Sequence, residues 1–215
     1  NELLRARYRG VDVCLKRFSL QDEKDTRAFR KEIGSVQRMK HPYIVNYTAV
    51  FEDDKSMYVQ MDYCAQGSMR KWLEGGPGVA QKRSMLRQIL LAIACIHSHK
   101  MLHCDLKAEN VLVADDGTPR ICDFEMTRDL DAAVQSTTIV GGTRGFMAPE
   151  ILSGAAKPSA ASDIYAFGVI IINTIHVPEP DAYPLTDPAL VTAPALKDLV
   201  PRLLSPTPEA RPNAA

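Results

Sequence analysis

The hydrophobic pattern of the chain changes from a strand period to a helix period near residue 65, and this change indicates an α+β fold. Before it, segments such as VDVCLKRF and SMYVQMDYC alternate apolar and polar residues, as half-buried β-strands do. After it, AQKRSMLRQILLAIACIHSHK carries a broad apolar face and SDIYAFGVIIINTIH is apolar nearly all round, which is typical of packed helices. We expect a small β-rich lobe at residues 1–64, a larger helical lobe at residues 65–215, and a small-molecule cleft between them.

Two segments refine this division. DEKDTRAFRKEIGSVQRMK places apolar residues at helical spacing and charges elsewhere, so one helix is expected inside the β-rich lobe. Near the end of the chain, LKDLVPRLL at residues 196–204 predicts one more helix.

The composition excludes several functional classes. The 26 basic and 26 acidic residues give a net charge of zero, which argues against a general binder of nucleic acid or of membrane surfaces. The longest apolar runs, ILLAIACI and FGVIII, are too short to span a bilayer. The five cysteines include no CxxC pair, which favours a reducing compartment such as the cytoplasm. The sequence does not indicate an oligomeric state.

Polar residues of complementary chemistry stand where two apolar elements meet. Asp105, Lys107 and Asn110 lie in HCDLKAENVL, and Asp123 follows a strand-like segment in ICDF. An amide oxygen and a carboxylate oxygen from separate segments suit Mg²⁺, which takes few protein ligands when it also binds substrate phosphates. Asp105 would then lie near the metal, where it could accept a proton from a hydroxyl or orient a nucleophile.

Two charged residues of the first lobe could complete this site. Lys16, in the strand VCLK, could meet the phosphates from the opposite lobe, and Glu32 could hold that lysine in place. Taken singly, Lys16 is a strand lysine whose stem covers apolar surface, and Glu32 is a solvated helix residue. Their order along the chain with Asp105 and Asp123 favours the functional interpretation.

Four short motifs follow one another in the order that the eukaryotic protein kinase family shows. VCLK resembles the family's V-A-I-K, HCDLKAEN resembles H-R-D-L-x-x-x-N, DFE resembles D-F-G, and APE at residues 148–150 matches unchanged. The resemblance runs through nearly the whole chain and implies the bilobal kinase fold. It also implies ATP and Mg²⁺ as cofactors and phosphoryl transfer to a protein substrate.

The resemblance assigns roles at the phosphate end of the cleft. Lys16 is expected to bind the α- and β-phosphates of ATP and to form an ion pair with Glu32. Asp105 is the expected catalytic base. Asn110 and Asp123 are the expected Mg²⁺ ligands.

The resemblance also implies an adenine pocket. Met61 is expected to guard the back of this pocket, and the backbone of Asp62 to Cys64 is expected to bond adenine. Leu112 would form the floor and Cys14 the roof, where the family usually has alanine.

The substrate side resembles serine/threonine kinases, in DLKAEN and in GGTRGFMAPE. The residues around RARYRGVDVCLKRF are similar to the tyrosine-kinase-like branch of that group. Lys107 is expected to offset the charge that develops on the transferred phosphoryl group, and Thr143 to bridge Asp105 and Lys107.

Three charged residues are expected to support the larger lobe. Asp163 matches the helix acid that steadies the catalytic loop in the family, although alone it could be a helix cap. Glu150 and Arg211 match the family's buried ion pair.

Two further residues depart from the family pattern. Glu125 replaces the glycine of D-F-G, so we expect a stiffer loop and a carboxylate that repels phosphates or adds a metal ligand. Cys104 replaces the arginine before the catalytic acid, and a neutral thiol cannot grip a phosphate. Control by phosphorylation at Ser136, Thr137 or Thr138 is therefore expected to be weak.

The ends of the sequence also bear on the interpretation. In the family's register the glycine-rich loop would lie at or before residue 1, and the last helix of the larger lobe would be cut short after residue 212. These features and Glu125 leave one alternative open, a pseudokinase that acts as a nucleotide-binding or scaffolding module. A small-molecule kinase is disfavoured by GTRGFMAPE, which resembles a protein-substrate loop.

Overall fold

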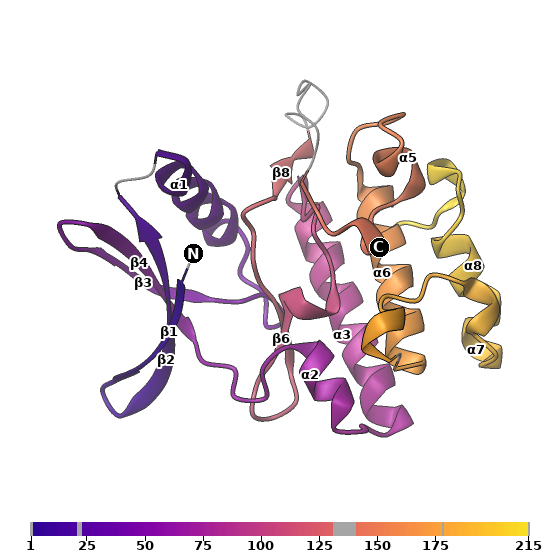
Figure 1. Ribbon diagram of the computed structural model, residues 1–215, viewed down its shortest axis with the longest axis horizontal. Coiled ribbons are helices and arrows are strands. Elements are labelled where there is room, and N and C mark those ends of the chain that lie inside the picture. The colour runs from indigo at the N-terminus through magenta and orange to yellow at the C-terminus, as the bar shows by residue number, and fades with distance from the viewer. Residues whose placement is uncertain (1, 21–22, 131–140, 178, 215) are drawn as a thin grey trace.

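The computed structural model describes residues 2–20, 23–130, 141–177 and 179–214, without the side chains of residues 23–25, 28, 31, 32 and 180. An antiparallel sheet with one helix lies at one end of the molecule, and most of the helices lie at the other (Figure 1). The predicted α+β class, with strands first and helices after them, is confirmed.

The sheet has four strands in the order β1-β2-β4-β3, and all neighbours pair antiparallel. The strands are β1 Glu2–Tyr8, β2 Val11–Ser19, β3 Tyr47–Glu52 and β4 Ser56–Asp62. The β1–β2 hairpin turns at Arg9 and Gly10, which both have positive φ, 49° and 81°, as a tight two-residue turn requires. Between β2 and β4, the register pairs Cys14 with Met61 and Lys16 with Val59.

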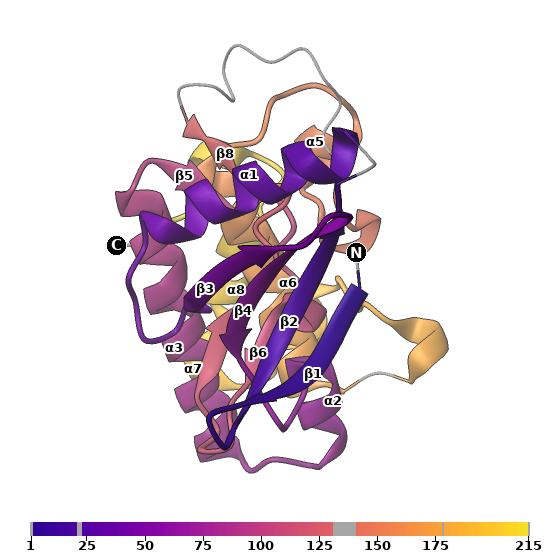
Figure 2. The same cartoon turned by 90° about the vertical axis from the view of Figure 1, so that its left-hand side faces the viewer.

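Helix α1 (Glu23–Gln37) packs against this sheet. Figure 2, which faces the sheet, shows α1 running across it. A small core of Phe18, Phe29, Met57 and Val59 joins the two, and the rings of Phe18 and Phe29 meet edge to face at 5.2 Å. Such aromatic pairs add about 0.5–1.5 kcal/mol beyond the area they bury, so this contact holds α1 on β2.

The second part consists of helices and short strand pairs. Its α-helices are α2 Met69–Glu74, α3 Val79–Ser98, α5 Pro149–Leu152, α6 Ala160–Ile175, α7 Pro194–Lys197 and α8 Leu199–Leu203. Its strands pair two by two: β5 Met101–Leu102 with β8 Arg128–Asp129, and β6 Val111–Val113 with β7 Pro119–Ile121. Single 3-10 turns are η1 Ala108–Asn110, η2 Arg144–Phe146, η3 Pro180–Ala182, η4 Pro188–Leu190 and η5 Pro208–Ala210.

Helix α6 is the centre of the second part. Its residues from 166 to 174 are all buried, as a segment that is apolar nearly all round predicts. A Cβ at Gly168 would stand 2.9 Å from Leu204 and 3.0 Å from Leu203, so this glycine lets the segment of α8 approach α6 closely.

The two parts share one apolar core. Ile44 forms a parallel bridge with Ile121, and Ser68 forms an antiparallel bridge with Leu112. Ile44 and Met61 from the first part belong to the same buried cluster as the residues of α3 and α6. Strands β6 and β7 are thereby joined to the segments that lead into β3 and away from β4.

The helix expected around LKDLVPRLL is present, but it is divided in two. The structure has two short helices, with α7 ending at Lys197 and α8 beginning at Leu199. Pro201 has no N–H to donate, and its ring crowds the carbonyl four residues earlier, which belongs to Lys197. The helix therefore ends there and restarts with Pro201 in the first turn of α8.

In the part of the chain that the structure describes, no helix is both long enough and apolar enough to cross a membrane. All five cysteines lie in that part and are free thiols.

Candidate active site

The polar loop between β5 and β6 is closed by a pair of side chains five residues apart. The side-chain nitrogen of Asn110 donates to the backbone oxygen of Asp105 at 2.9 Å and to its Oδ2 at 3.0 Å. Asn110 reaches back because it ends the 3-10 turn η1. The amide therefore orients the carboxylate and leaves its own oxygen as the atom that could hold a cation.

A buried carboxylate on α6 fixes the start of this loop. Asp163 is 2% exposed and accepts the backbone N–H groups of His103 at 2.9 Å and of Cys104 at 3.0 Å. Nε2 of His97, near the end of α3, lies 3.0 Å from the same carboxylate. Cys104 has a φ of 66°, a left-handed conformation that is costly for a non-glycine residue. The charge-assisted bond from its N–H helps to hold it there.

His103 connects the loop to the segment after β7. It is fully buried, and its Nδ1 accepts the backbone N–H of Asp105 at 3.3 Å. Nε2 must then carry the hydrogen, which it donates to the carbonyl of Cys122 at 3.0 Å. The ring packs against Phe124 with centroids 5.1 Å apart. One imidazole thus sets the position of Asp105 relative to Asp123.

Asp105, Lys107 and Thr143 form a closed network. Oδ1 of Asp105 accepts both the N–H and the hydroxyl of Thr143, each at 2.9 Å. Oδ2 lies 2.8 Å from the ammonium of Lys107, which also donates to the Thr143 hydroxyl at 2.7 Å. Together with the bond from Asn110, these contacts use about the full accepting capacity of a carboxylate.

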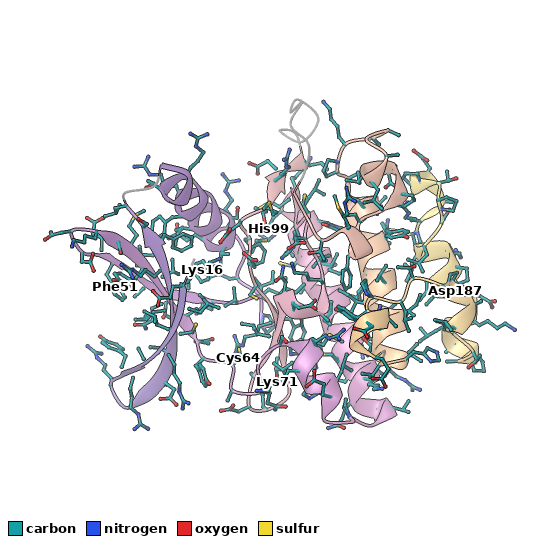
Figure 3. The ribbon with its side chains drawn as sticks, in the orientation of Figure 1. Lys16, Phe51, Cys64, Lys71, His99 and Asp187 are labelled. Carbon is teal, nitrogen blue, oxygen red and sulfur yellow. The ribbon has the colours of Figure 1, made fainter. Side chains whose placement is uncertain are left out.

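On the other side of the cleft, Lys16 faces two carboxylates. Its Nζ lies 3.3 Å from Oδ1 of Asp123 and 2.8 Å from Oε1 of Glu125. The Lys16 side chain is 9% exposed and lies on the side of the sheet that faces the helices (Figure 3). Asp123 has a φ of 64°, so the site contains a second strained residue.

Lys16, Asp123 and Glu125 line one cavity of about 270 Å³. Six of the predicted site residues are among its walls: Cys14, Lys16, Met61, Asn110, Leu112 and Asp123. Cys14 and Met61 are paired across β2 and β4, so these apolar members lie together. The cavity therefore offers an apolar surface for a flat ring and charged groups for a polar tail.

The side chains of Asp62 and Cys64 are not among the walls of this cavity. The carboxylate of Asp62 lies 3.1 Å from the guanidinium of Arg120. Cys64 is buried in the connection from the sheet to α2 (Figure 3), and its carbonyl accepts the N–H of Gly67 at 3.0 Å. The expected bonds from their backbone to adenine stay a prediction.

Some predicted groups lie outside the described residues. Glu32 belongs to α1, but its side chain is not described, so the Lys16–Glu32 ion pair stays a prediction. Ser136, Thr137 and Thr138 are also outside the described residues.

The donor set of the cavity fits one kind of cation. Among the residues that the structure describes, no three His, Cys, Asp or Glu side chains cluster as metal ligands, which is the arrangement that zinc needs. The amide oxygen of Asn110 and the carboxylate of Asp123 line the same cavity. Two such oxygens suit Mg²⁺ that takes its other ligands from phosphates and water.

An ion pair outside the cavity supports the segment that carries Thr143. Arg211 holds both carboxylate oxygens of Glu150, at 2.7 and 2.8 Å, and donates to the backbone oxygens of Ser205 and Ala161. The Arg211 side chain is 0% exposed and that of Glu150 is 9% exposed. The structure thus brings together the two residues that the sequence predicts as a pair.

Burial raises the pKa of two thiols on β2 and in the connection from the sheet to α2. It raises the pKa of Cys14, against the opposing effect of Lys16, and raises the pKa of Cys64 to about 11. Both thiols are therefore protonated and weakly nucleophilic near neutral pH.

Several partners in the site were missed from the sequence. His97 supports Asp163, and its sequence signal was a histidine near the end of an apolar helix. Glu125 was expected to meet phosphates or a metal. No pattern in the neighbouring sequence predicts its contact with Lys16. The hydroxyl of Tyr183 donates to Glu109 at 3.0 Å.

A comparison with protein families places this geometry in context. The model of the family described as protein kinase domain matches residues 3–215. The match includes every site residue described above.

Curated relatives carry serine/threonine-protein kinase names. A bifunctional serine/threonine-protein kinase/NEDD4-like E3 ubiquitin-protein ligase of Dictyostelium discoideum is 36% identical over 79% of the chain and 10% of the relative. Mouse serine/threonine-protein kinase Nek1 is 34% identical over 71% of the chain and 13% of the relative. A serine/threonine-protein kinase 4 homolog A of Dictyostelium discoideum is 28% identical over 95% of the chain and 48% of the relative. The chain thus spans less than half the length of each of these relatives.

Proposed function

Because the chain belongs to the protein kinase domain family, we propose that it transfers the γ-phosphoryl group of ATP to serine and threonine hydroxyls of a protein substrate. The observation that carries this proposal is the Asp105 carboxylate, held by Asn110, Lys107 and Thr143 beside the cavity that Lys16 and Asp123 line. A scaffold has no need for a carboxylate that is oriented by three separate side chains.

The cavity binds the nucleotide in this account. Adenine lies against the apolar walls formed by Cys14, Met61 and Leu112, and the phosphates extend toward Lys16. The Lys16 ammonium neutralises phosphate oxygens as a point charge. Asn110 and Asp123 would hold Mg²⁺, which would supply positive charge to offset the negative charge of the phosphates.

Asp105 receives the substrate hydroxyl by exchanging one of its present bonds. Its two oxygens accept four hydrogen bonds in the structure, so one partner has to leave before a hydroxyl can bind. Lys107 is the partner whose departure has a second use, since its ammonium then faces the transferred phosphoryl group. The freed position on Oδ2 orients the hydroxyl and accepts its proton.

Thr143 links this exchange to the substrate side. Its hydroxyl accepts from Lys107 and donates to Asp105, so it keeps both groups in place while the lysine changes partner. The serine/threonine specificity is supported by the names of the relatives and by the lysine two residues after Asp105. A location in the cytoplasm is supported by the five free thiols.

The alternative of a pseudokinase predicts nucleotide binding without transfer. The discriminating experiment gives the full-length protein that contains this domain Mg·ATP and peptides with serine, threonine or tyrosine acceptors. We expect transfer to serine and threonine, and a drop of at least about 100-fold in Asp105→Asn, because a positioned base contributes about 10²–10⁴-fold.

Two controls make the result specific. The affinity for ATP should stay the same in Asp105→Asn, since this carboxylate lies beyond the nucleotide. Asp54→Asn removes an exposed carboxylate of the β3–β4 turn and should leave the rate unchanged. Equal transfer rates in the wild type and Asp105→Asn would refute the proposed function.

A further inference from the structure

The ammonium of Lys16 has its shorter carboxylate contact with Glu125 rather than with Asp123. The distances are 2.8 Å to Oε1 of Glu125 and 3.3 Å to Oδ1 of Asp123. The Lys16 side chain is 9% exposed and that of Glu125 is 25% exposed. This ion pair is therefore sheltered, and solvent screens it less than a surface pair.

Among the described residues that line this end of the cavity, carboxylates outnumber ammonium groups. One ammonium faces two carboxylates, and Glu109 contributes a third carboxylate to the same walls. A nucleotide polyphosphate is itself strongly negative, so it meets like charge unless a carboxylate withdraws or a cation accompanies it. Asp123 is needed for that cation in the proposed function, which leaves Glu125 as the group that could withdraw.

The backbone allows Glu125 to withdraw without a rearrangement of the loop. The non-glycine residues with positive φ in the described part of the chain are Arg9, Lys100, Cys104 and Asp123. Glu125 is not among them, so its backbone lies in a region that any residue adopts. Rotation about its own side-chain bonds is enough to move its carboxylate from Lys16.

We propose that Glu125 competes with the phosphates of the bound nucleotide for Lys16 and thereby lowers the affinity of the domain for nucleoside polyphosphates. The inference rests on the proposed function, because it takes the cavity to be the nucleotide site. In this proposal the charge of Glu125, which replaces the glycine of the family motif, sets the affinity for the nucleotide. The effect grows with the number of phosphates and is missing for the nucleoside alone.

The test compares the affinities of adenosine, ADP and ATP, each with Mg²⁺, by calorimetry on the full-length protein. Glu125→Gln keeps the size of the side chain and removes its charge, and Glu125→Asp keeps the charge but shortens its reach. Glu52→Gln removes one exposed carboxylate from β3 of the same lobe and controls for net charge. Melting temperatures of all variants confirm that they are folded.

We expect Glu125→Gln to bind Mg·ATP about tenfold more tightly, a change that corresponds to about 1.4 kcal/mol. Glu125→Asp should lie between this variant and the wild type. Adenosine should bind all four proteins equally, and Glu52→Gln should match the wild type for every ligand.

Three outcomes would overturn the inference in distinguishable ways. Equal ATP affinity in Glu125→Gln and the wild type would show that Glu125 does not compete. Weaker Mg·ATP binding in Glu125→Gln would show that Glu125 is instead a ligand of the cation. If none of the proteins binds ATP or adenosine, the proposed nucleotide site is refuted, and the inference about Glu125 is refuted with it.

Discussion

Thr143 donates two hydrogen bonds to one oxygen of Asp105, one from its backbone N–H and one from its hydroxyl, both at 2.9 Å. This contact ties the segment before α5 to the loop between β5 and β6. Gly142 makes the approach possible, since its φ is 150° and a Cβ there would stand 3.2 Å from the carbonyl of Cys104. The orientation of the proposed base thus depends on a residue 38 positions later in the chain.

Removing the hydroxyl of Thr143 should lower kcat. Thr143→Ala loses one bond to Asp105 and leaves Lys107 without one of its acceptors, so we expect a drop of about tenfold, the size of one hydrogen bond to a charged group. Thr143→Ser keeps the hydroxyl and should retain most of the activity. The rates are measured with saturating ATP and peptide. Equal loss in both variants would mean that the methyl group matters rather than the hydroxyl.

Asp163 should be the site where a single substitution loosens the catalytic loop most. Asp163→Ala leaves the buried N–H of His103 and the partly buried N–H of Cys104 without their acceptor, and we expect a loss of about 2–5 kcal/mol in the free energy of unfolding. His97→Ala removes one contact of the same carboxylate and should cost only about 1 kcal/mol. Urea unfolding of both variants measures these values. A larger loss for His97→Ala than for Asp163→Ala would contradict this account.

The buried pair of Glu150 and Arg211 should behave as a unit. Arg211→Met leaves a carboxylate that is 9% exposed without its counter-charge, and we expect a loss of about 3–5 kcal/mol in the free energy of unfolding. The double variant Glu150→Met/Arg211→Met should be more stable than Arg211→Met, because it buries no unpaired charge. Additive losses in a double-mutant cycle would show that the two residues do not interact.

Cys64 should make stability depend on alkaline pH. Burial raises its pKa to about 11 in the folded protein, whereas the thiol of an unfolded chain has a pKa of about 8.5. The folded state therefore holds the proton more tightly than the unfolded state does. The stability that this thiol contributes is complete below about pH 8.5 and is lost as the pH rises toward about 11. The slope from this group is at most about 1.4 kcal/mol per pH unit.

The comparison with Cys64→Ala isolates this contribution. Denaturant unfolding of both proteins between about pH 8 and about pH 10 should show the stability of the wild type falling more steeply. Parallel curves would mean that the thiol of Cys64 titrates alike in the folded and unfolded states.

The hydrophobic pattern predicted the elements in which it matches the burial of the residues, and it failed where another physical effect decides the backbone. The strands at residues 11–19 and 56–62 and the helix α6 were predictable because hydrophobic period and burial agree along them. The break between α7 and α8 was missed because the apolar spacing continues across Pro201. A missing donor and a ring that crowds one carbonyl outweigh that spacing.

The residues of the candidate site were chosen from the sequence, and only some of the contacts that the structure shows among them were expected. Asp105, Asn110 and Asp123 were singled out as candidates because metal and phosphate chemistry restricts the residue types that can serve it. The contact of Glu125 with Lys16 could not, because it depends on how the segment after β7 faces β2 in three dimensions. No periodicity along a sequence records which charged groups meet across a cleft.

The binding of ATP in the presence and absence of Mg²⁺ tests the central claim most directly, measured by calorimetry on the full-length protein and on its Asp123→Asn variant. The account predicts that Mg²⁺ strengthens ATP binding at least about tenfold (about 1.4 kcal/mol) in the wild type, and that most of this gain is lost in Asp123→Asn. A wild-type protein that takes up no nucleotide, or whose affinity for ATP is the same with and without Mg²⁺, would contradict it.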